Sequence, residues 1–255
     1  MAALPTIVSF VGAGPGDPEL ITVKGMRLLQ EADVVVYAGS LVQRAALAFC
    51  RSGVEAHDSA SMNLDEIIGV MAGASKEGRR CVRLHTGDPG LYGALREQTA
   101  ALEALSIPYE VVPGVSSAFA SAAALKRELT APGGSQTVIF TRMAGRTPVP
   151  QSENLASLAS HNATICVFLS VASIDDVVRE LSVGYAVSTP AAVVYKVTWE
   201  DERIITGTLA DIADKVRDAG ITRHALILVG DALGSESGPA SKLYNKAFSH
   251  GYRNG

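Results

Sequence analysis

Three glycine-rich turns carry the residues whose types and spacing best suit ligand chemistry. They are residues 12–18 (GAGPGDP), 87–93 (GDPGLYG) and 113–120 (PGVSSAFA), and each directly follows a short apolar segment. Glycine lets the main chain approach a bound molecule closely. Open α/β sheets bind ligands at the carboxyl ends of their strands, which is where such turns lie. The pattern predicts a small-molecule site built largely from main-chain groups.

The first turn resembles a dinucleotide fingerprint but departs from it. In G-x-G-x-x-G the third glycine would fall at position 17, which is Asp17. Its carboxylate would repel a pyrophosphate, and Pro15 lacks an N–H donor. A nucleotide-binding regulatory or dehydrogenase module remains the alternative of a different class. That alternative needs an acidic residue after the second strand, where Tyr37 and Ala38 stand instead. A tight turn without a ligand is the other alternative.

The second and third turns each allow a functional and a structural interpretation. Asp88 can accept a hydrogen bond from a ribose or an amino group, or it can cap the following helix. Ser116 and Ser117 stand where a helix begins and leaves N–H donors available to a ligand, or one of them only caps that helix. His85 is interpreted as a packed strand residue.

Charge is unevenly distributed along the chain. The formal net charge is −4 and the pI is near 5.8, which argues against general affinity for nucleic acid or anionic membranes. Residues 111–152 are basic, however, because Lys126, Arg127, Arg142 and Arg146 face only Glu128. This region either holds a polyanionic small molecule or is a chance fluctuation on a solvated surface.

The composition excludes several protein classes. Hydrophobic residues make up 47% of the chain and charged residues 19%, which is sufficient for a packed core and excludes intrinsic disorder. The cysteines at 50, 81 and 166 are scattered, so neither a disulfide framework nor a metal site is expected. No basic segment precedes the first apolar run, and residues 154–174, although free of charge, contain several polar residues. We expect a cytoplasmic protein without a membrane span.

Apolar segments of strand length alternate with segments of helical periodicity. Repeated alternation predicts a mainly parallel sheet covered by helices in the first part of the chain. A hairpin near Trp199 predicts a mixed sheet in the second part. We expect two α/β domains, at 1–115 and 116–240, and a poorly ordered tail at 241–255. The expected strands are 6–11, 33–37, 81–85, 109–113, 137–140, 164–169, 191–196, 203–206 and 225–229, and the expected helices are 20–31, 64–76, 94–105, 153–160, 174–181 and 209–219.

Jointly, the turns and the basic loop resemble the corrin/porphyrin methyltransferase family of two-domain α/β enzymes that use S-adenosylmethionine. The motifs VGAGPGDPELIT, GDPGLYG, PGVSSAFA, ICVFLS and TPAAVVYK occur in that order over nearly the whole chain. The resemblance implies C-methylation of a precorrin-type tetrapyrrole in cobalamin biosynthesis by a homodimer, without a metal. Uroporphyrinogen III, another precorrin position or a diphthamide-type substrate are alternatives within the family. A noncatalytic scaffold would leave the glycine-rich turns unexplained.

The resemblance also implies where the ligands bind. S-adenosylmethionine would lie in the cleft between the domains, with Leu169 flanking its adenine. The first turn would border the tetrapyrrole through Pro15 and Gly16. The chemistry of such a reaction adds two further expectations. Asp17 would remove a proton after methylation, and Arg142 and Arg146 of the basic region would bind the carboxylates of a polycarboxylate substrate. The residues implied to contact the cofactor are Gly87, Asp88, Leu91, Ser116, Ser117, Leu169, Ala192 and Ala225.

Overall fold

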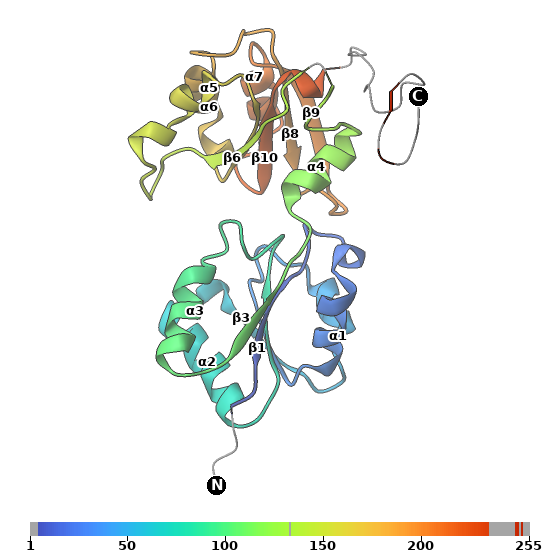
Figure 1. Ribbon diagram of the computed structural model, residues 1–255, viewed down its shortest axis with the longest axis vertical. Coiled ribbons are helices and arrows are strands. Elements are labelled where there is room, and N and C mark those ends of the chain that lie inside the picture. Colours follow the sequence, from blue (N-terminus) through green and yellow to red (C-terminus); the bar gives the residue numbers. More distant parts are fainter. Residues whose placement is uncertain (1–4, 133, 235–247, 250, 252–255) are drawn as a thin grey trace. The chain divides into compact units, whose positions relative to one another are not determined.

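The chain forms two compact units. The computed structural model describes residues 5–132, 134–234, 248–249 and 251, so most of the expected tail at 241–255 lies outside the described residues. The first unit comprises Met1–Ala120 and Lys196–Asp201, and the second comprises Ser121–Tyr195 and Glu202–Gly255. The division therefore follows Ala120, whereas the sequence places it after residue 115. Each unit contains one sheet with helices packed against it (Figure 1).

The first unit is built on a five-stranded parallel sheet in the order β3-β2-β4-β1-β5. The sequence predicts four of these strands, namely the three inner ones and the edge strand β5. The edge strand β3 was not predicted, because its sequence EAHD is polar and largely exposed. The strands are β1 (Val8–Gly12), β2 (Val34–Tyr37), β3 (Glu55–Asp58), β4 (Cys81–His85) and β5 (Tyr109–Val112).

Helices cover both faces of this sheet, which explains the near-continuous burial of β1, β2 and β4. On one face Leu29 of α1 and Ala46 of η2 pack against Val11, Val35 and other strand residues. On the other face α2 and α3 cover a second cluster, and Figure 1 shows these two helices on the opposite side of the sheet from α1. The bounds are η1 Pro18–Leu20, α1 Val23–Glu31, η2 Arg44–Phe49, η3 Ser59–Ser61, α2 Leu64–Lys76 and α3 Leu95–Ala104.

The second unit has a mixed five-stranded sheet, as the sequence predicts. Its order is β6-β7-β10-β8-β9; β6 and β7 are parallel, and the other neighbouring pairs are antiparallel. The carboxyl ends of β6, β7 and β8 therefore share one edge with the amino ends of β9 and β10. The strands are β6 (Val138–Arg142), β7 (Thr164–Phe168), β8 (Pro190–Tyr195), β9 (Arg203–Thr208) and β10 (Ala225–Val229).

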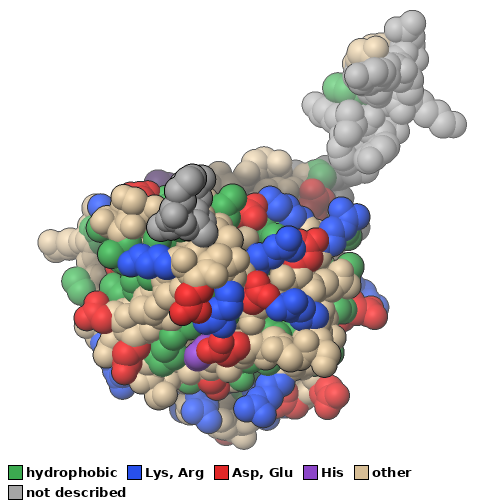
Figure 2. All heavy atoms as spheres, turned by 90° about the horizontal axis from the view of Figure 1, so that it is seen from below, with side chains coloured by type: hydrophobic (Ala, Val, Ile, Leu, Met, Phe, Trp, Pro, Cys, Tyr) green, Lys and Arg blue, Asp and Glu red, His purple; other side chains and the backbone are tan. Residues whose placement is uncertain are grey.

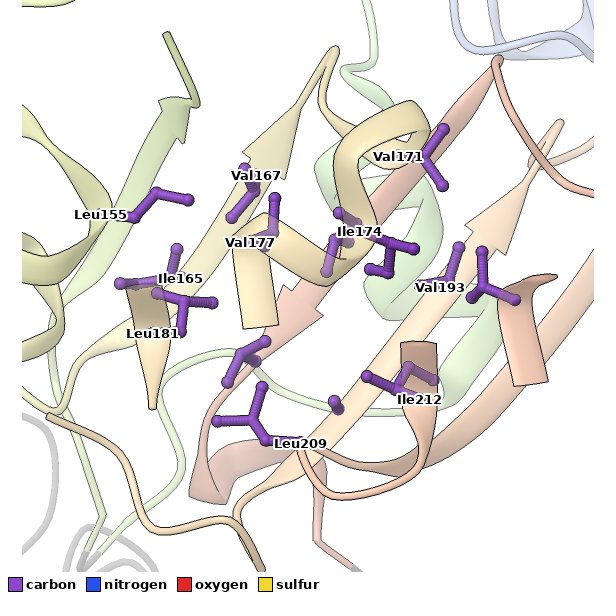
Figure 3. Close-up of a cluster of buried hydrophobic side chains, with 14 of the residues drawn as sticks. Leu155, Ile165, Val167, Val171, Ile174, Val177, Leu181, Val193, Leu209 and Ile212 are labelled. Carbon is purple, nitrogen blue, oxygen red and sulfur yellow. The ribbon is translucent and has the colours of Figure 1, made fainter. Parts of the chain in front are cut away.

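One apolar cluster forms the core of the second unit. Ile174, Val177 and Leu181 of α6 point toward Ile165 and Val167 of β7 (Figure 3), and each of these side chains is at most 4% exposed. The α4 helix begins in the first unit and ends in the second. The remaining bounds are α4 Ser117–Leu125, η4 Gln151–Glu153, α5 Leu155–Ala159, η5 Val171–Ser173, α6 Ile174–Leu181, α7 Ile212–Asp218 and η6 Asp231–Leu233.

Ion pairs occupy the amino edge of the first sheet. Arg79 pairs with Glu55 and Glu77, Arg80 with Glu31, and Arg51 with Asp33. Positive and negative side chains are intermixed on the face seen in Figure 2. Within the described ranges, no helix has the length and apolar character needed to cross a membrane.

Candidate functional site

The three glycine-rich turns converge at the carboxyl edge of the first sheet. Strand β1 lies between β4 and β5, and the three strands are parallel, so the turns that follow them are neighbours. The N–H of Gly87 donates to the carbonyl of Gly14 at 2.7 Å, and the N–H of Gly14 donates to the carbonyl of Gly87 at 3.3 Å. The first two turns therefore form one hydrogen-bonded unit.

The turns approach so closely that two positions require glycine. A Cβ on Gly114 would lie 2.2 Å from the carbonyl oxygen of Gly87, and a Cβ on Gly12 would lie 2.6 Å from the Cα of Gly114. Those neighbours are main-chain atoms and cannot rotate away. Gly87 itself has a φ of +61°, in the left-handed region. Side chains at positions 12 and 114 would therefore clash with main-chain atoms where the three turns meet.

Asp88 joins the second turn to the third. Its Oδ2 accepts a hydrogen bond from the N–H of Gly114 at 2.9 Å, and its Oδ1 accepts one from the N–H of Gly90 at 2.7 Å. The sequence left helix capping and ligand binding open as roles for this carboxylate. The structure shows a third role, because both oxygens hold main-chain groups of the turns themselves.

Ser116 and Ser117 stand at the beginning of α4. The buried Ser116 hydroxyl accepts a hydrogen bond from the N–H of Ala118 at 3.3 Å, and Ser117 is the first residue of the helix. The capping interpretation therefore accounts for Ser116. Leu91 lies on the same edge, and its N–H donates to the carbonyl of Asp88 at 3.3 Å. The structure thus brings together all five cofactor residues that the resemblance implies for the first unit.

The first turn is held from a distant part of the sequence. The indole Nε1–H of Trp199 donates to the carbonyl of Pro15 at 3.0 Å, and the N–H of Asp17 donates to the Thr198 hydroxyl at 2.8 Å. Asp17 accepts a hydrogen bond from the N–H of Glu19 at 2.8 Å through Oδ1, which caps η1. Sequence reasoning assigned no role to Thr198 or Trp199, and their only signal was the chain's single tryptophan in a hairpin loop.

His85 is part of the core beneath the second turn. It is 6% exposed, and its ring lies 5.8 Å from that of Phe10. Burial, together with the nearby Arg83 cation, lowers the pKa of His85 to about 3. The packed-strand interpretation is therefore confirmed, and His85 is neutral at physiological pH. Its Nε2 has no hydrogen-bond partner among the described residues.

Of the residues implied for the second unit, some lie at one edge of its sheet and one lies inside a strand. Arg142 ends β6, Leu169 follows β7 and Ala225 begins β10, so the strand directions place these three at one edge. Leu169 is 75% exposed and has a φ of +56°. Ala192 instead lies within β8 opposite Leu228 and is 1% exposed.

The two arginines of the basic loop differ in their surroundings. The guanidinium of Arg142 donates to the carbonyls of Met143, Thr147 and Pro148 at 3.3, 3.1 and 2.8 Å, which folds the loop around it. Arg146 is exposed, and within the described part of the chain no carboxylate is within ion-pair distance of it.

Among residues 5–132, 134–234, 248–249 and 251, no group of three or more His, Cys, Asp or Glu could hold a metal ion.

Comparison with known proteins identifies the family. The model of the tetrapyrrole (corrin/porphyrin) methylases matches residues 8–213, which is most of the chain. This chain belongs to the tetrapyrrole methylase family. The cobalt-precorrin-4 C(11)-methyltransferase of Methanocaldococcus jannaschii is 54% identical over 247 residues, which cover 96% of this chain and 95% of the relative. The precorrin-4 C(11)-methyltransferase of Pseudomonas aeruginosa is 46% identical, with 97% and 99% covered.

Solved structures of other tetrapyrrole methylases share the fold. A cobalt precorrin-4 methyltransferase superposes with a TM-score of 0.87 at 49% identity, over 89% of this chain and 95% of that one. A uroporphyrin-III C-methyl transferase from Thermus thermophilus, complexed with S-adenyl homocysteine, gives a TM-score of 0.75 at 29% identity, over 89% and 93%. The expected two-sheet α/β class and the family resemblance are thereby confirmed, and the chain is a methyltransferase.

The hydrogen bonds between Gly14 and Gly87 and from Gly114 to Asp88 hold the three turns together. Methyl transfer needs two reactants held in line, and a rigid main-chain edge suits that requirement. Asp17 stands where a dinucleotide-binding motif would have its third glycine, which is consistent with a methylase that binds no dinucleotide at this turn.

Proposed function

We propose that this protein transfers a methyl group from S-adenosylmethionine to C-11 of precorrin-4, giving precorrin-5 in cobalamin biosynthesis. The observation that carries the proposal is the convergence of the three glycine-rich turns into one braced main-chain edge in a chain of this family. Relatives named for the C-11 position, at 46% and 54% identity over nearly the full length, support that position over others.

The cofactor site in this proposal uses residues of both units. Gly87, Asp88, Leu91, Ser116 and Ser117 supply the first unit's share, and the braced turns fit a ligand held mainly by main-chain groups. From the second unit, exposed Leu169 offers an apolar surface for a flat base. Because the side chains of Ala192 and Ala225 are small, they leave room for main-chain contact. The relative complexed with S-adenyl homocysteine supports this choice of cofactor.

The substrate site in this proposal lies at the first turn and the basic loop. Pro15 and Gly16 border the macrocycle, and Arg146 meets its carboxylates with a guanidinium that has no ion-pair partner in the described chain. Arg142 contributes its charge and also folds the loop that carries Arg146. Guanidinium groups suit carboxylates because they pair with them bidentately.

The chemistry requires positioning and one proton acceptor. S-adenosylmethionine supplies an electrophilic methyl group, and an attacking carbon held about 3–3.5 Å from it needs little further activation. The new carbon–carbon bond forms as the sulfonium carbon–sulfur bond breaks, and the macrocycle then loses a proton. Asp17, partly exposed beside Gly16, is the carboxylate that we propose takes it.

Incubation with labelled S-adenosylmethionine and a panel of macrocycles tests the proposal. The panel contains precorrin-4 with and without cobalt, an earlier precorrin and uroporphyrinogen III. We expect label only with a precorrin-4 species and, by NMR, only at C-11. Label on uroporphyrinogen III, or at another precorrin carbon, would contradict the C-11 assignment. Sedimentation of the same sample tests the accompanying proposal of a homodimer.

A further inference from the structure

The loop between β8 and β9 belongs to a different unit from the two strands that it joins. Residues Lys196–Asp201 belong to the first unit, although β8 and β9 on either side pair with each other in the second. We call residues 196–201 the β8–β9 loop. It is hydrogen-bonded to the first glycine-rich turn, about 180 residues earlier in the chain.

The β8–β9 loop holds the first turn on both sides of Gly16. Trp199 donates to the carbonyl of Pro15, and Thr198 accepts from the N–H of Asp17, at 3.0 and 2.8 Å. Gly16 lies between these bonds, and a Cβ on it would come within 2.2 Å of the indole Cδ1 of Trp199 and within 2.9 Å of the Thr198 hydroxyl. The turn and the loop therefore fit together only while position 16 is glycine.

The loop's backbone is strained, which shows that its contacts determine its conformation. Lys196 has a φ of +45° and Thr198 a φ of +67°, both in the left-handed region, where a β-branched residue such as Thr198 is especially disfavoured. Lys196 pairs with Asp201 at 2.6 Å, and its ammonium lies 5.3 Å from the centre of the Trp199 ring. These interactions stabilise the loop with the indole turned toward the first turn. Strain maintained in this way is characteristic of functional segments.

We propose that the β8–β9 loop is a positioning element for the tetrapyrrole, and that Trp199 and Thr198 act by fixing the main chain of the turn that borders it. The proposal rests on the proposed function, in which Pro15 and Gly16 border the macrocycle. The hydrogen bonds of Trp199 with Pro15 and of Asp17 with Thr198 join the loop to the first turn, whereas the proposed cofactor residues of this unit lie on the second and third turns. We therefore expect the loop to affect binding of the methyl acceptor more than binding of the methyl donor.

Substitutions in the loop test which reactant it serves. Trp199→Phe keeps an aromatic ring and removes the Nε1–H donor. We expect it to raise the KM for the tetrapyrrole about fivefold, because the turn that borders the substrate is less firmly held, and to leave the affinity for S-adenosylhomocysteine nearly unchanged. Loss of this internal hydrogen bond should lower the melting temperature by only about 2–4 °C. Thr198→Val should have a similar effect, and Thr198→Ser, which keeps the hydroxyl, should restore the KM.

Fluorescence gives a readout that does not depend on activity. Trp199 is the only tryptophan in the sequence, so emission excited at 295 nm reports this loop alone. Gly16→Ala should displace the indole, shift its emission to the red and expose it to iodide quenching while far-UV circular dichroism stays native. The matched control is Gly69→Ala, at an exposed helical glycine whose Cβ would meet nothing within 4 Å. It should leave the emission unchanged.

The outcomes separate this proposal from the proposed function. A wild-type protein that methylates no tetrapyrrole overturns both. A wild-type protein that methylates precorrin-4 while the Phe and Val variants keep its KM overturns the positioning role alone. An equal loss of S-adenosylhomocysteine affinity in those variants, or failure of Thr198→Ser to restore the KM, also overturns it. Unchanged Trp199 emission in Gly16→Ala would show that the turn and the loop are not in contact.

Discussion

Asp88 shows how a single carboxylate can organise the main chain of a site. Each of its oxygens accepts from a different main-chain N–H, one on its own turn and one on the turn after β5. Hydrogen bonds to a charged acceptor are stronger than those between neutral groups. The position of Gly114, and with it the approach of the third turn to Gly12, therefore depends on this side chain.

Asp88→Asn should destabilise the protein although it preserves size. The amide can offer only one oxygen, so its NH2 group must face the N–H of either Gly90 or Gly114 and leave that donor unsatisfied. We expect a loss of about 1–3 kcal/mol in the free energy of unfolding, measured in urea. Asp65→Asn, at an exposed carboxylate in α2, is the control and should change stability by less than about 0.5 kcal/mol. Equal effects of the two substitutions would contradict the bracing role.

His85 makes the stability of the first unit depend on pH. Its pKa is about 3 in the folded chain, below its ordinary value of 6.5, because burial disfavours the imidazolium. Between these two values the unfolded chain binds one more proton than the folded chain. Stability contributed by the neutral ring is therefore complete above about pH 6.5 and is lost as the pH falls toward 3.

Replacement of His85 should flatten the acid dependence of stability. Between pH 7 and pH 5 the wild type should lose about 2 kcal/mol more in unfolding free energy than His85→Leu. Urea unfolding at the two pH values measures this difference, and any constant effect of the substitution cancels. His161→Gln, at an exposed histidine, should keep the wild-type dependence. An identical slope for His85→Leu and wild type would place the acid sensitivity elsewhere.

At the scale of elements, strong local patterns were sufficient to predict most of the fold. The apolar runs of β1, β2 and β4 predicted a parallel sheet, since strands buried on both faces lack alternation. The edge strand β5 was also predicted, although only Val112 of its four residues is buried. Strand β3 carries no such signal because it is an exposed edge strand. The predicted helix at 20–31 is shorter, since the Thr22 side chain caps α1 and the chain before it forms η1.

The parts of the candidate site that consist of residues close together in the sequence were predictable. The parts that depend on contacts between distant segments were not. Glycine-rich turns after β1, β4 and β5 were enough to place these turns at one edge of a parallel sheet. The mutual approach of Gly12 and Gly114 and the contacts of Trp199 with Pro15 depend on tertiary packing across about 100 and 180 residues. Arg142 is a similar case. Its residue type suggested that it binds the carboxylates of the substrate, and its hydrogen bonds to carbonyls of its own loop could not be predicted from the sequence.

At the scale of the whole molecule, two cysteines report on the two units separately. Cys81 lies in β4 of the first unit and Cys166 in β7 of the second, both at most 1% exposed. Burial raises the pKa of each thiol to about 12, so neither should react with a thiol reagent at pH 8 until its unit opens. Cys50 is only partly buried, and Cys50→Ser removes its contribution.

Labelling of these two thiols tests whether the cofactor engages both units. In dilute urea the labelling rate of each cysteine follows the opening of its own surroundings. S-adenosylhomocysteine at 100 times its Kd should stabilise whatever it contacts by about 2.7 kcal/mol and slow labelling there about a hundredfold. The proposed cofactor residues lie on both units, so mass spectrometry should show Cys81 and Cys166 protected together, with no protection by NAD. Protection of Cys81 alone would remove Leu169, Ala192 and Ala225 from the cofactor site, because a ligand confined to the turns of the first sheet would leave the opening of the second unit unchanged.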